Sequence, residues 1–213
     1  MDDAALYALF PEARHFTAVK YKLFLSAIEL FAKQGYSNTA THQIARKAQV
    51  SEASLFKCFT NKQGILTMIL KPVAHHILPD VIKEFSQKVL QKKTADLNEL
   101  ITLMVHNRLD FCQQHQELTQ IYLNEMITDA VWRQKLVQYY PQTLMQDFDT
   151  EINYLRARQK IVNWNNTEIF RFILTNIFGY FLEHYVLFPQ KSWQPQVGVC
   201  HLITFITNGL SAN

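Results

Sequence analysis

The sequence is poor in glycine, proline and cysteine, and each shortage excludes a class of protein. Five glycines and six prolines in 213 residues leave little material for the many turns of an all-β fold. The three cysteines, at positions 58, 112 and 200, form no even disulfide framework and match no zinc-binding spacing. Reduced thiols in a cytoplasm are the simplest interpretation.

Secretion and membrane signals are also lacking. The N-terminus carries two aspartates and no basic region before its apolar residues, so it is no secretory signal. The longest apolar segment, 169–188, contains arginine, asparagine, glutamate and histidine, which favours a buried helix over a membrane span. We therefore expect a cytoplasmic protein that makes no contact with a membrane.

The chain has no arrangement of side chains typical of an enzyme. Asp147 and Asp149 are two residues apart on a predicted helix and face different ways. Cys112 and His115 lack further ligands at metal-binding spacing, and neither a glycine-rich phosphate loop nor a G-x-S-x-G elbow is present. We expect no enzyme activity, no catalytic residue, no cofactor and no metal site.

What the sequence does contain is helical periodicity. Apolar residues make up 48% of the chain and charged residues 18%, a globular composition. Their spacing predicts an all-α protein of about nine or ten helices. The first runs from about Thr17 to Gln34 and is closed by Gly35, a natural C-cap. Asn61 is a plausible N-cap for a helix that starts near Lys62.

The segment 39–62 has the pattern of two short helices joined by a tight turn. The apolar positions form one stripe on each helix, and short or polar side chains lie between them. This arrangement suits a helix pair whose second member enters a DNA major groove. The apolar residues are Ile44, Ala45, Ala48, Val50, Leu55, Phe56 and Phe59.

Charge is distributed unevenly along the chain. Residues 17–71 hold eight lysines or arginines and two acids, a net charge of +6, while the whole chain is +3 and the remainder therefore −3. A basic N-terminal region on a mildly acidic body is what a polyanion-binding module needs. A solvated helical surface with chance asymmetry is the alternative.

Residues 16 to about 71 resemble the DNA-binding domain of the TetR family, the tetracycline-repressor-like transcriptional regulators. The resemblance lies in AIELFAKQGY at 27–36, IARKA at 44–48, VSEASLF at 50–56 and FTNKQGIL at 59–66. It implies an all-α fold in two domains. Residues 1–71 would form an N-terminal arm and a three-helix helix-turn-helix DNA-binding domain, and residues 72–213 a helical effector-binding and dimerisation domain.

The resemblance also implies which residues meet DNA. Ser54 could bond several bases, Ala53 could contact a thymine methyl group, and Glu52 could accept from cytosine or cap its own helix. Lys62 opens a helix where its charge favours a phosphate. The full predicted DNA-binding set is Thr41, His42, Ser51, Glu52, Ala53, Ser54, Phe56, Lys57 and Lys62.

Three positions depart from the family pattern. Phe56 replaces the usual tyrosine, Cys58 the usual aromatic or histidine, and Gln49 the usual turn glycine, which tolerates positive φ better than glutamine does. Together they leave open a one-residue shift in the turn.

The resemblance further implies a cavity for a small effector and a dimer built from the last two helices. A mostly apolar effector is expected, although a plain helical core explains the same aromatic residues. Candidate effector residues are His106, Arg108, Phe111, Tyr122, Met126, Trp132 and Asn176. Candidate dimerisation residues are Phe170, Ile173, Ile177, Phe181, Leu202, Phe205 and Ile206, for which burial inside one subunit is the alternative.

These observations predict a ligand-responsive, sequence-specific transcriptional regulator. As a homodimer it would read a pseudo-palindromic operator, and repression is the expected direction. The alternative is a helical protein-interaction module that has lost operator binding.

Overall fold

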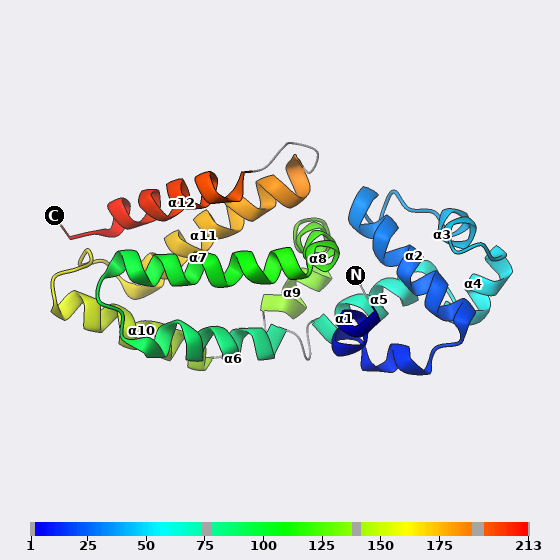
Figure 1. Ribbon diagram of the computed structural model, residues 1–213, viewed down its shortest axis with the longest axis horizontal. Coiled ribbons are helices and arrows are strands. Elements are labelled where there is room, and N and C mark those ends of the chain that lie inside the picture. The colour runs from blue at the N-terminus through cyan, green and yellow to red at the C-terminus, as the bar shows by residue number, and fades with distance from the viewer. Residues whose placement is uncertain (1–2, 74–77, 138–141, 189–193, 213) are drawn as a thin grey trace. The chain divides into compact units, whose positions relative to one another are not determined.

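The computed structural model describes residues 3–73, 78–137, 142–188 and 194–212, and across these ranges it consists of helices and their connections without a β-strand (Figure 1). The all-α prediction is confirmed. The DNA-binding end begins with α1 (Asp3–Leu9) and a 3₁₀ turn η1 (Pro11–His15), followed by α2 (Ala18–Gln34), α3 (Thr41–Lys47), α4 (Glu52–Phe59) and α5 (Lys62–Pro72).

The middle and end of the chain contain the remaining helices. They are α6 (Leu78–Lys88), η3 (Leu90–Lys92), α7 (Leu97–Gln114), α8 (Gln116–Thr128), α9 (Ala130–Val137), α10 (Gln142–Ala157), α11 (Asn166–Leu182), a π-helical turn η4 (Glu183–Leu187) and α12 (Pro195–Leu210). Helix α1 had no counterpart in the sequence-based prediction.

The chain divides into two compact units. The first combines residues 1–79 with residues 115–139, and the second combines 80–114 with 140–213. Helices α8 and α9, from the middle of the sequence, therefore belong with α1 to α5. The predicted domain limit after residue 71 stays a prediction.

Local rules explain where α2 begins and ends. The Thr17 hydroxyl accepts the backbone N–H of Lys20 at 3.3 Å, a side-chain N-cap. At the other end, Gly35 donates to the Phe31 carbonyl at 3.0 Å and has φ +82°. Its ψ of 156° puts it in a region that only glycine enters freely.

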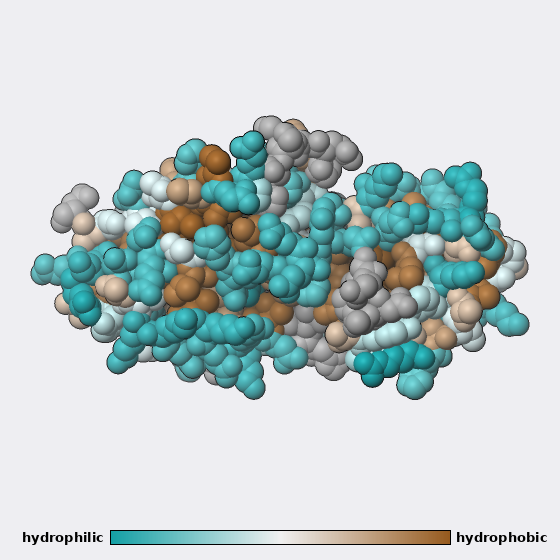
Figure 2. All heavy atoms as spheres, viewed as in Figure 1, coloured by the Kyte–Doolittle hydropathy of each residue, from teal (hydrophilic) through white to brown (hydrophobic). Residues whose placement is uncertain are grey.

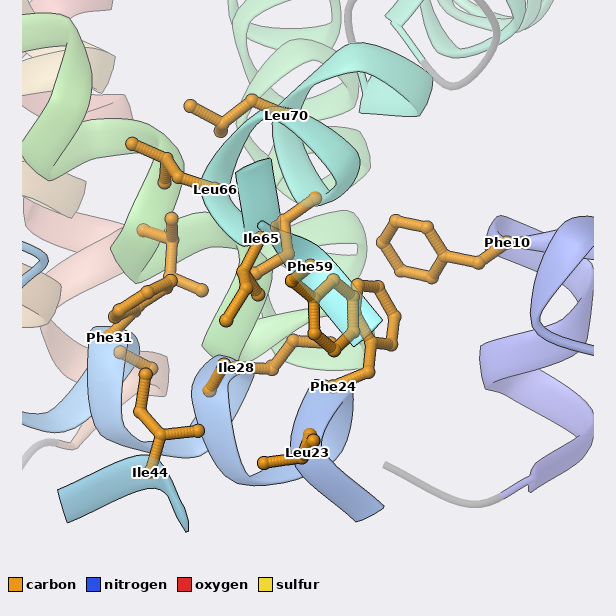
Figure 3. Packing of buried hydrophobic residues seen from close by; sticks show 14 of the residues in the cluster. Phe10, Leu23, Phe24, Ile28, Phe31, Ile44, Phe59, Ile65, Leu66 and Leu70 are labelled. Atoms are coloured by element: carbon orange, nitrogen blue, oxygen red, sulfur yellow. The ribbon is translucent and has the colours of Figure 1, made fainter. Parts of the chain in front are cut away.

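The core of the first unit is aromatic and includes parts of the chain that are far apart in sequence (Figure 3). Phe10 points toward the side chains of α2, and its ring meets Phe24 edge to face at 5.2 Å between centroids. Leu118, Ile121 and Trp132, from α8 and α9, belong to the same buried cluster. The DNA-binding helices thus share one hydrophobic core with α8 and α9.

In the second unit α12 packs against α7 and α11, and a hydrophobic patch reaches the surface where α12 and α7 lie side by side (Figure 2). Gly198 allows α12 to approach Tyr180 of α11 closely, because a Cβ at that position would lie 2.3 Å from the phenol oxygen. Buried Glu151 of α10 accepts both the backbone N–H of Thr94, at 2.8 Å, and its hydroxyl. This pair fixes the connection that precedes α7.

Candidate DNA-binding site

The turn between α3 and α4 has a well-defined geometry. Gln49 adopts φ +57° and donates to the Arg46 carbonyl at 3.1 Å, while Val50 donates to the Ala45 carbonyl at 3.0 Å. These two bonds are those of a Schellman motif, in which the residue with positive φ is usually glycine. The chain therefore makes the expected turn with a residue that is poorly suited to it.

Helix α4 is buried on one side and open on the other. Ser51 caps it, since its hydroxyl accepts the Ser54 backbone N–H at 3.2 Å. Leu55 and Phe59 point into the core, and they are 0% and 6% exposed. The side chains of the opposite face, all exposed, are Glu52, Ala53, Phe56 and Lys57. An eight-residue helix is about 12 Å long, a length comparable with the width of a major groove.

Glu52 interacts with the start of α3. Its carboxylate accepts a hydrogen bond from the hydroxyl of Thr41, so this side chain links α3 to α4. Thr41 is half-buried and the neighbouring His42 is exposed. Two predicted DNA contacts are thus engaged with each other, and a cytosine would have to share the carboxylate with Thr41.

The basic side chains differ in what they touch. Lys47 is paired with Glu29 at 2.6 Å. Lys20 lies over the rings of Phe16 and Phe59, at 4.4 and 5.4 Å from their centroids. Lys57 is exposed on the open side of α4, where it is available to a phosphate.

Lys62 does not point away from the protein. Its ammonium donates to the carbonyls of Tyr36 and Thr39, both at 2.8 Å, and lies 4.1 Å from the centre of the Tyr36 ring. Burial lowers the pKa of Lys62, and nearby Glu125 acts in the opposite direction. A phosphate contact by Lys62, as predicted, would have to compete with two carbonyls.

A polar network before α3 was not predicted. The Gln43 carbonyl oxygen accepts the backbone N–H of Ala40 at 2.8 Å and the side-chain amide of Gln34 at 3.0 Å. Buried Thr39 donates its hydroxyl to the Gly35 carbonyl at 2.8 Å. A glutamine three residues after the start of a helix was the available signal, because it is half of a capping box.

The predicted effector residues have different surroundings. Trp132 belongs to the core of the first unit, and we withdraw it as a ligand contact because its indole packs against its own subunit. His106 is exposed on α7, and Asn176 donates to the Phe172 carbonyl of its own helix at 2.8 Å. Tyr122 and Met126 are half-buried on α8.

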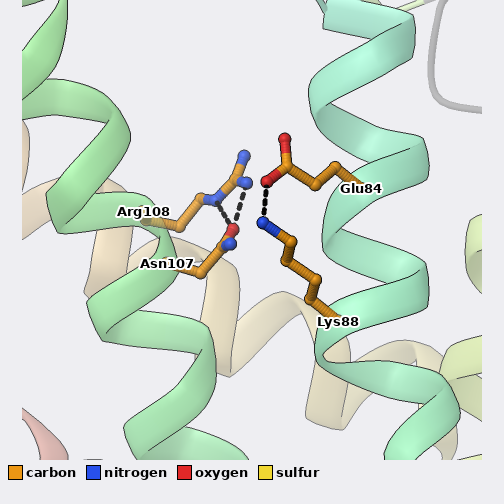
Figure 4. Close-up of polar contacts among 4 residues, drawn as sticks. All are labelled: Glu84, Lys88, Asn107 and Arg108. Atoms are coloured by element: carbon orange, nitrogen blue, oxygen red, sulfur yellow. Dashed lines mark hydrogen bonds and ion pairs between the residues drawn. The ribbon is translucent and has the colours of Figure 1, made fainter.

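Arg108 points from α7 toward α6 (Figure 4). Its Nε donates to the Asn107 amide oxygen at 3.2 Å, and its guanidinium lies 4.9 Å from the centre of the Phe85 ring and 5.9 Å from that of Phe111. On α6, Lys88 pairs with Glu84. Arg108 is therefore half-buried among aromatic rings, and its role in binding an effector stays a prediction.

Four of the predicted dimerisation residues are buried inside the subunit. Ile173, Ile177, Phe181 and Ile206 are 0%, 5%, 4% and 4% exposed. A partner chain could not reach them, so assigning them to the subunit interface was wrong. The apolar stripe of a helix is buried first against the helices of its own subunit.

Other side chains of α11 and α12 remain open. Phe205 is 68% exposed, Val197 51% and Phe172 45%, while Phe170 and Leu202 are half-buried. Trp164, 44% exposed, contacts Phe172 with 5.7 Å between ring centroids. Of the predicted set, Phe205 is thus the residue most available to a partner.

Comparison with known proteins agrees with this geometry. The family model described as "Bacterial regulatory proteins, tetR family" matches residues 23–69, which span α2 to α5. The chain belongs to the TetR family. It is 26% identical over 191 residues to the uncharacterized HTH-type transcriptional regulator YvkB of Bacillus subtilis, an alignment that covers 88% of this chain and 95% of YvkB.

Solved TetR-type structures share the fold. The ketosteroid transcriptional regulator KstR2 of Mycobacterium tuberculosis aligns with a TM-score of 0.63 and 14% identity, over 91% of this chain and 95% of KstR2. FadR from Bacillus subtilis, in complex with stearoyl-CoA, aligns with a TM-score of 0.60 and 16% identity, over 88% and 97%. These relatives are regulators, in agreement with the prediction that this TetR-family chain is not an enzyme.

Among the described residues, no helix combines the length and the apolar character needed to cross a bilayer.

Proposed function

We propose that this TetR-family protein is a sequence-specific DNA-binding repressor that inserts α4 into the major groove. The observation that carries the proposal is the division of α4 into a buried side and an open side. Leu55 and Phe59 hold the helix in the core, while Ala53, Phe56 and Lys57 face outward. Helix α3 and the Schellman turn fix the angle at which α4 leaves the domain.

The exposed residues have chemistry suited to different parts of a duplex. Ala53 and Phe56, three positions apart on one helical side, can contact thymine methyl groups. Ser54 can bond a base edge, and Lys57 can neutralise a phosphate. Phe56 is 47% exposed, and a duplex would remove part of that aromatic surface from water.

Selection from a random duplex library tests the proposal. We expect enrichment of a pseudo-palindrome whose affinity falls steeply with salt. Lys57→Ala should weaken binding to all selected sequences alike and reduce the salt slope by about 1, whereas Ser54→Ala should change which sequence is preferred. No duplex binding at low salt would support the alternative, a helical protein-interaction module.

We also propose that the protein acts as a homodimer through the open side of α11 and α12. Phe172, Val197 and Phe205 supply apolar area there, and a Cβ at Gly179 or Gly209 would meet nothing inside the subunit, which leaves room for a second copy. Two linked reading helices then bind one operator more tightly than either does alone.

Phe205→Glu tests the dimer. It places a carboxylate from each subunit in the interface, so we expect the dimer dissociation constant, measured by analytical ultracentrifugation, to rise roughly 100-fold or more. Val131→Glu, at a site on α9 that is 61% exposed, is the matched control and should leave it unchanged. An unaffected dimer in Phe205→Glu would show that another surface is used.

The effector is proposed to be small and mostly apolar. FadR was solved with stearoyl-CoA, a ligand with a long apolar chain, and α7 offers Arg108 beside Phe85 and Phe111 as a contact for an acidic group. Thermal-shift measurements with fatty acids and their alcohols, in wild type and in Arg108→Gln, test this. A preference for the acids that disappears in the variant is the expected result.

A further inference from the structure

Glu125 is an acid buried in the first unit, on the side of α8 near Lys62. It is 5% exposed. Burial raises the pKa of Glu125, the neighbouring charge of Asp129 adds to that effect, and Lys62 opposes it. Tyr36 is also close, because Glu125 and Asp129 both raise the pKa of its phenol. Four ionisable groups therefore share one region: Tyr36, Lys62, Glu125 and Asp129.

Lys62 and its neighbour tie α5 to the connection between α2 and α3. The ammonium binds two carbonyls of that connection at 2.8 Å and covers the Tyr36 ring. The Tyr36 hydroxyl donates to the Gln63 amide oxygen at 2.7 Å. The first two residues of α5 thus hold both the backbone and the side chain of this connection.

The connection leads directly into the DNA-binding helices. Thr39, one of the two acceptors, precedes Ala40, the N-cap residue of α3. Helix α3 packs against α4, and Thr41 bonds to Glu52 across them. A shift of the Lys62 ammonium would therefore move the start of α3 and, with it, the angle of α4.

We propose that Glu125 is a positioning residue for DNA binding, which acts from α8 by holding the Lys62 ammonium against the carbonyls of Tyr36 and Thr39. The inference rests on the proposed DNA-binding function and deepens it. Helix α8 directly follows α7 in the chain, so the middle of the sequence gains an electrostatic contact with the helices that read DNA. A carboxylate in a desolvated place interacts with an ammonium more strongly than it would in water.

Stability and DNA affinity should respond to Glu125 in different ways. Because the folded pKa of Glu125 is raised, the folded protein holds the proton more tightly than the unfolded chain does, and ionisation of Glu125 costs stability as the pH rises. Glu125→Gln should therefore leave the melting temperature unchanged or raise it. A residue with only a structural role would not combine that result with weaker DNA binding.

The experiment is a double-mutant cycle on the full chain. A duplex selected by the wild type is labelled, and its dissociation constant is measured by fluorescence anisotropy at constant salt. Glu125→Gln and Lys62→Met should each weaken binding about three- to ten-fold, and the double variant should bind like Lys62→Met alone. Lys62→Arg, which keeps the positive charge, should retain the dependence on Glu125.

Glu12→Gln is the matched control, since it removes one negative charge from an exposed site in the same unit. It should bind as the wild type does or slightly more tightly. Independent, multiplicative effects of Glu125→Gln and Lys62→Met would overturn the inference, and so would tighter binding by Glu125→Gln.

A pH series gives a second readout. The affinity ratio between wild type and Glu125→Gln should shrink toward one as the pH falls and the Glu125 carboxylate is protonated in the wild type. The charged groups that face it are Lys62, Tyr36 and Asp129. A pH-independent ratio would contradict the role of the charge. Failure of the wild type to select any duplex would instead refute the proposed function, and this inference with it.

Discussion

Gln49 is the residue at which the sequence conflicts most clearly with the turn that it forms. Its φ of +57° lies in the left-handed region, which costs a residue with a Cβ roughly 1–2 kcal/mol. Its side chain is exposed, so replacing it removes little packing. Gln49→Gly should relieve the backbone strain while keeping both hydrogen bonds of the Schellman motif.

The expected gain is smaller than the strain. Glycine gives the unfolded chain more freedom, which offsets roughly 0.4–1 kcal/mol. The free energy of unfolding of the first unit should therefore rise by about 0.5–1 kcal/mol, or about 2–4 °C per kcal/mol in the melting temperature of a chain of this size. Buried Trp132 lies in the same core and can report the transition by fluorescence during urea unfolding.

Arg46→Gly is the matched control. Arg46 is exposed inside α3, three residues earlier, and glycine there adds the same freedom to the unfolded chain without relieving strain. It should destabilise by about 0.7–1 kcal/mol. Equal losses in both variants would refute the reasoning, because they would show that Gln49 gains nothing from leaving the left-handed conformation. DNA affinity, by contrast, should not change in Gln49→Gly.

Three further predictions concern caps, buried polar groups and pH. Ser51→Ala removes the N-cap of α4 and should cost about 1 kcal/mol in urea unfolding, most of which Ser51→Asp should restore. Glu151→Ala leaves the Thr94 N–H and hydroxyl buried without their acceptor and should cost about 3 kcal/mol by the same measurement, whereas Thr94→Ser should be mild. Burial lowers the pKa of His115 and His184 from the ordinary 6.5, so the unfolded chain binds protons first and stability should fall as the pH drops below about 6.5. Calorimetry from pH 7.5 to 5 should show that fall, and replacing both histidines with glutamine should reduce it.

The features that the sequence predicted well are those decided within one turn of helix. Asn61 caps α5 by accepting the Gly64 N–H at 2.8 Å, as its residue type and position indicated. Gly35 has the positive φ expected of it. The donor, the acceptor and the backbone angle in these cases come from residues two to four positions apart, and the sequence shows all of them together.

The features that were missed depend on contacts between distant parts of the chain. The predicted phosphate contact of Lys62 follows from its place at a helix N-terminus, and nothing in its local sequence indicates the carbonyls of Tyr36 and Thr39 as acceptors. Trp132 has the composition of a ligand contact, yet it lies in the core of the DNA-binding unit. An aromatic residue on an amphipathic helix has the same local pattern whether a ligand or another helix covers it.

The shared core of the first unit explains why these misassignments occurred together. Leu6 and Phe10 cover the DNA-binding helices from the N-terminal side of the chain, and Leu118, Ile121 and Trp132 add to the same cluster from α8 and α9. A three-helix DNA-binding domain has too little volume to bury all of its apolar residues by itself. Because the helices that complete this core come from the middle of the chain, residues expected to contact an effector stabilise the DNA-binding unit, and a buried acid such as Glu125 comes close to Lys62.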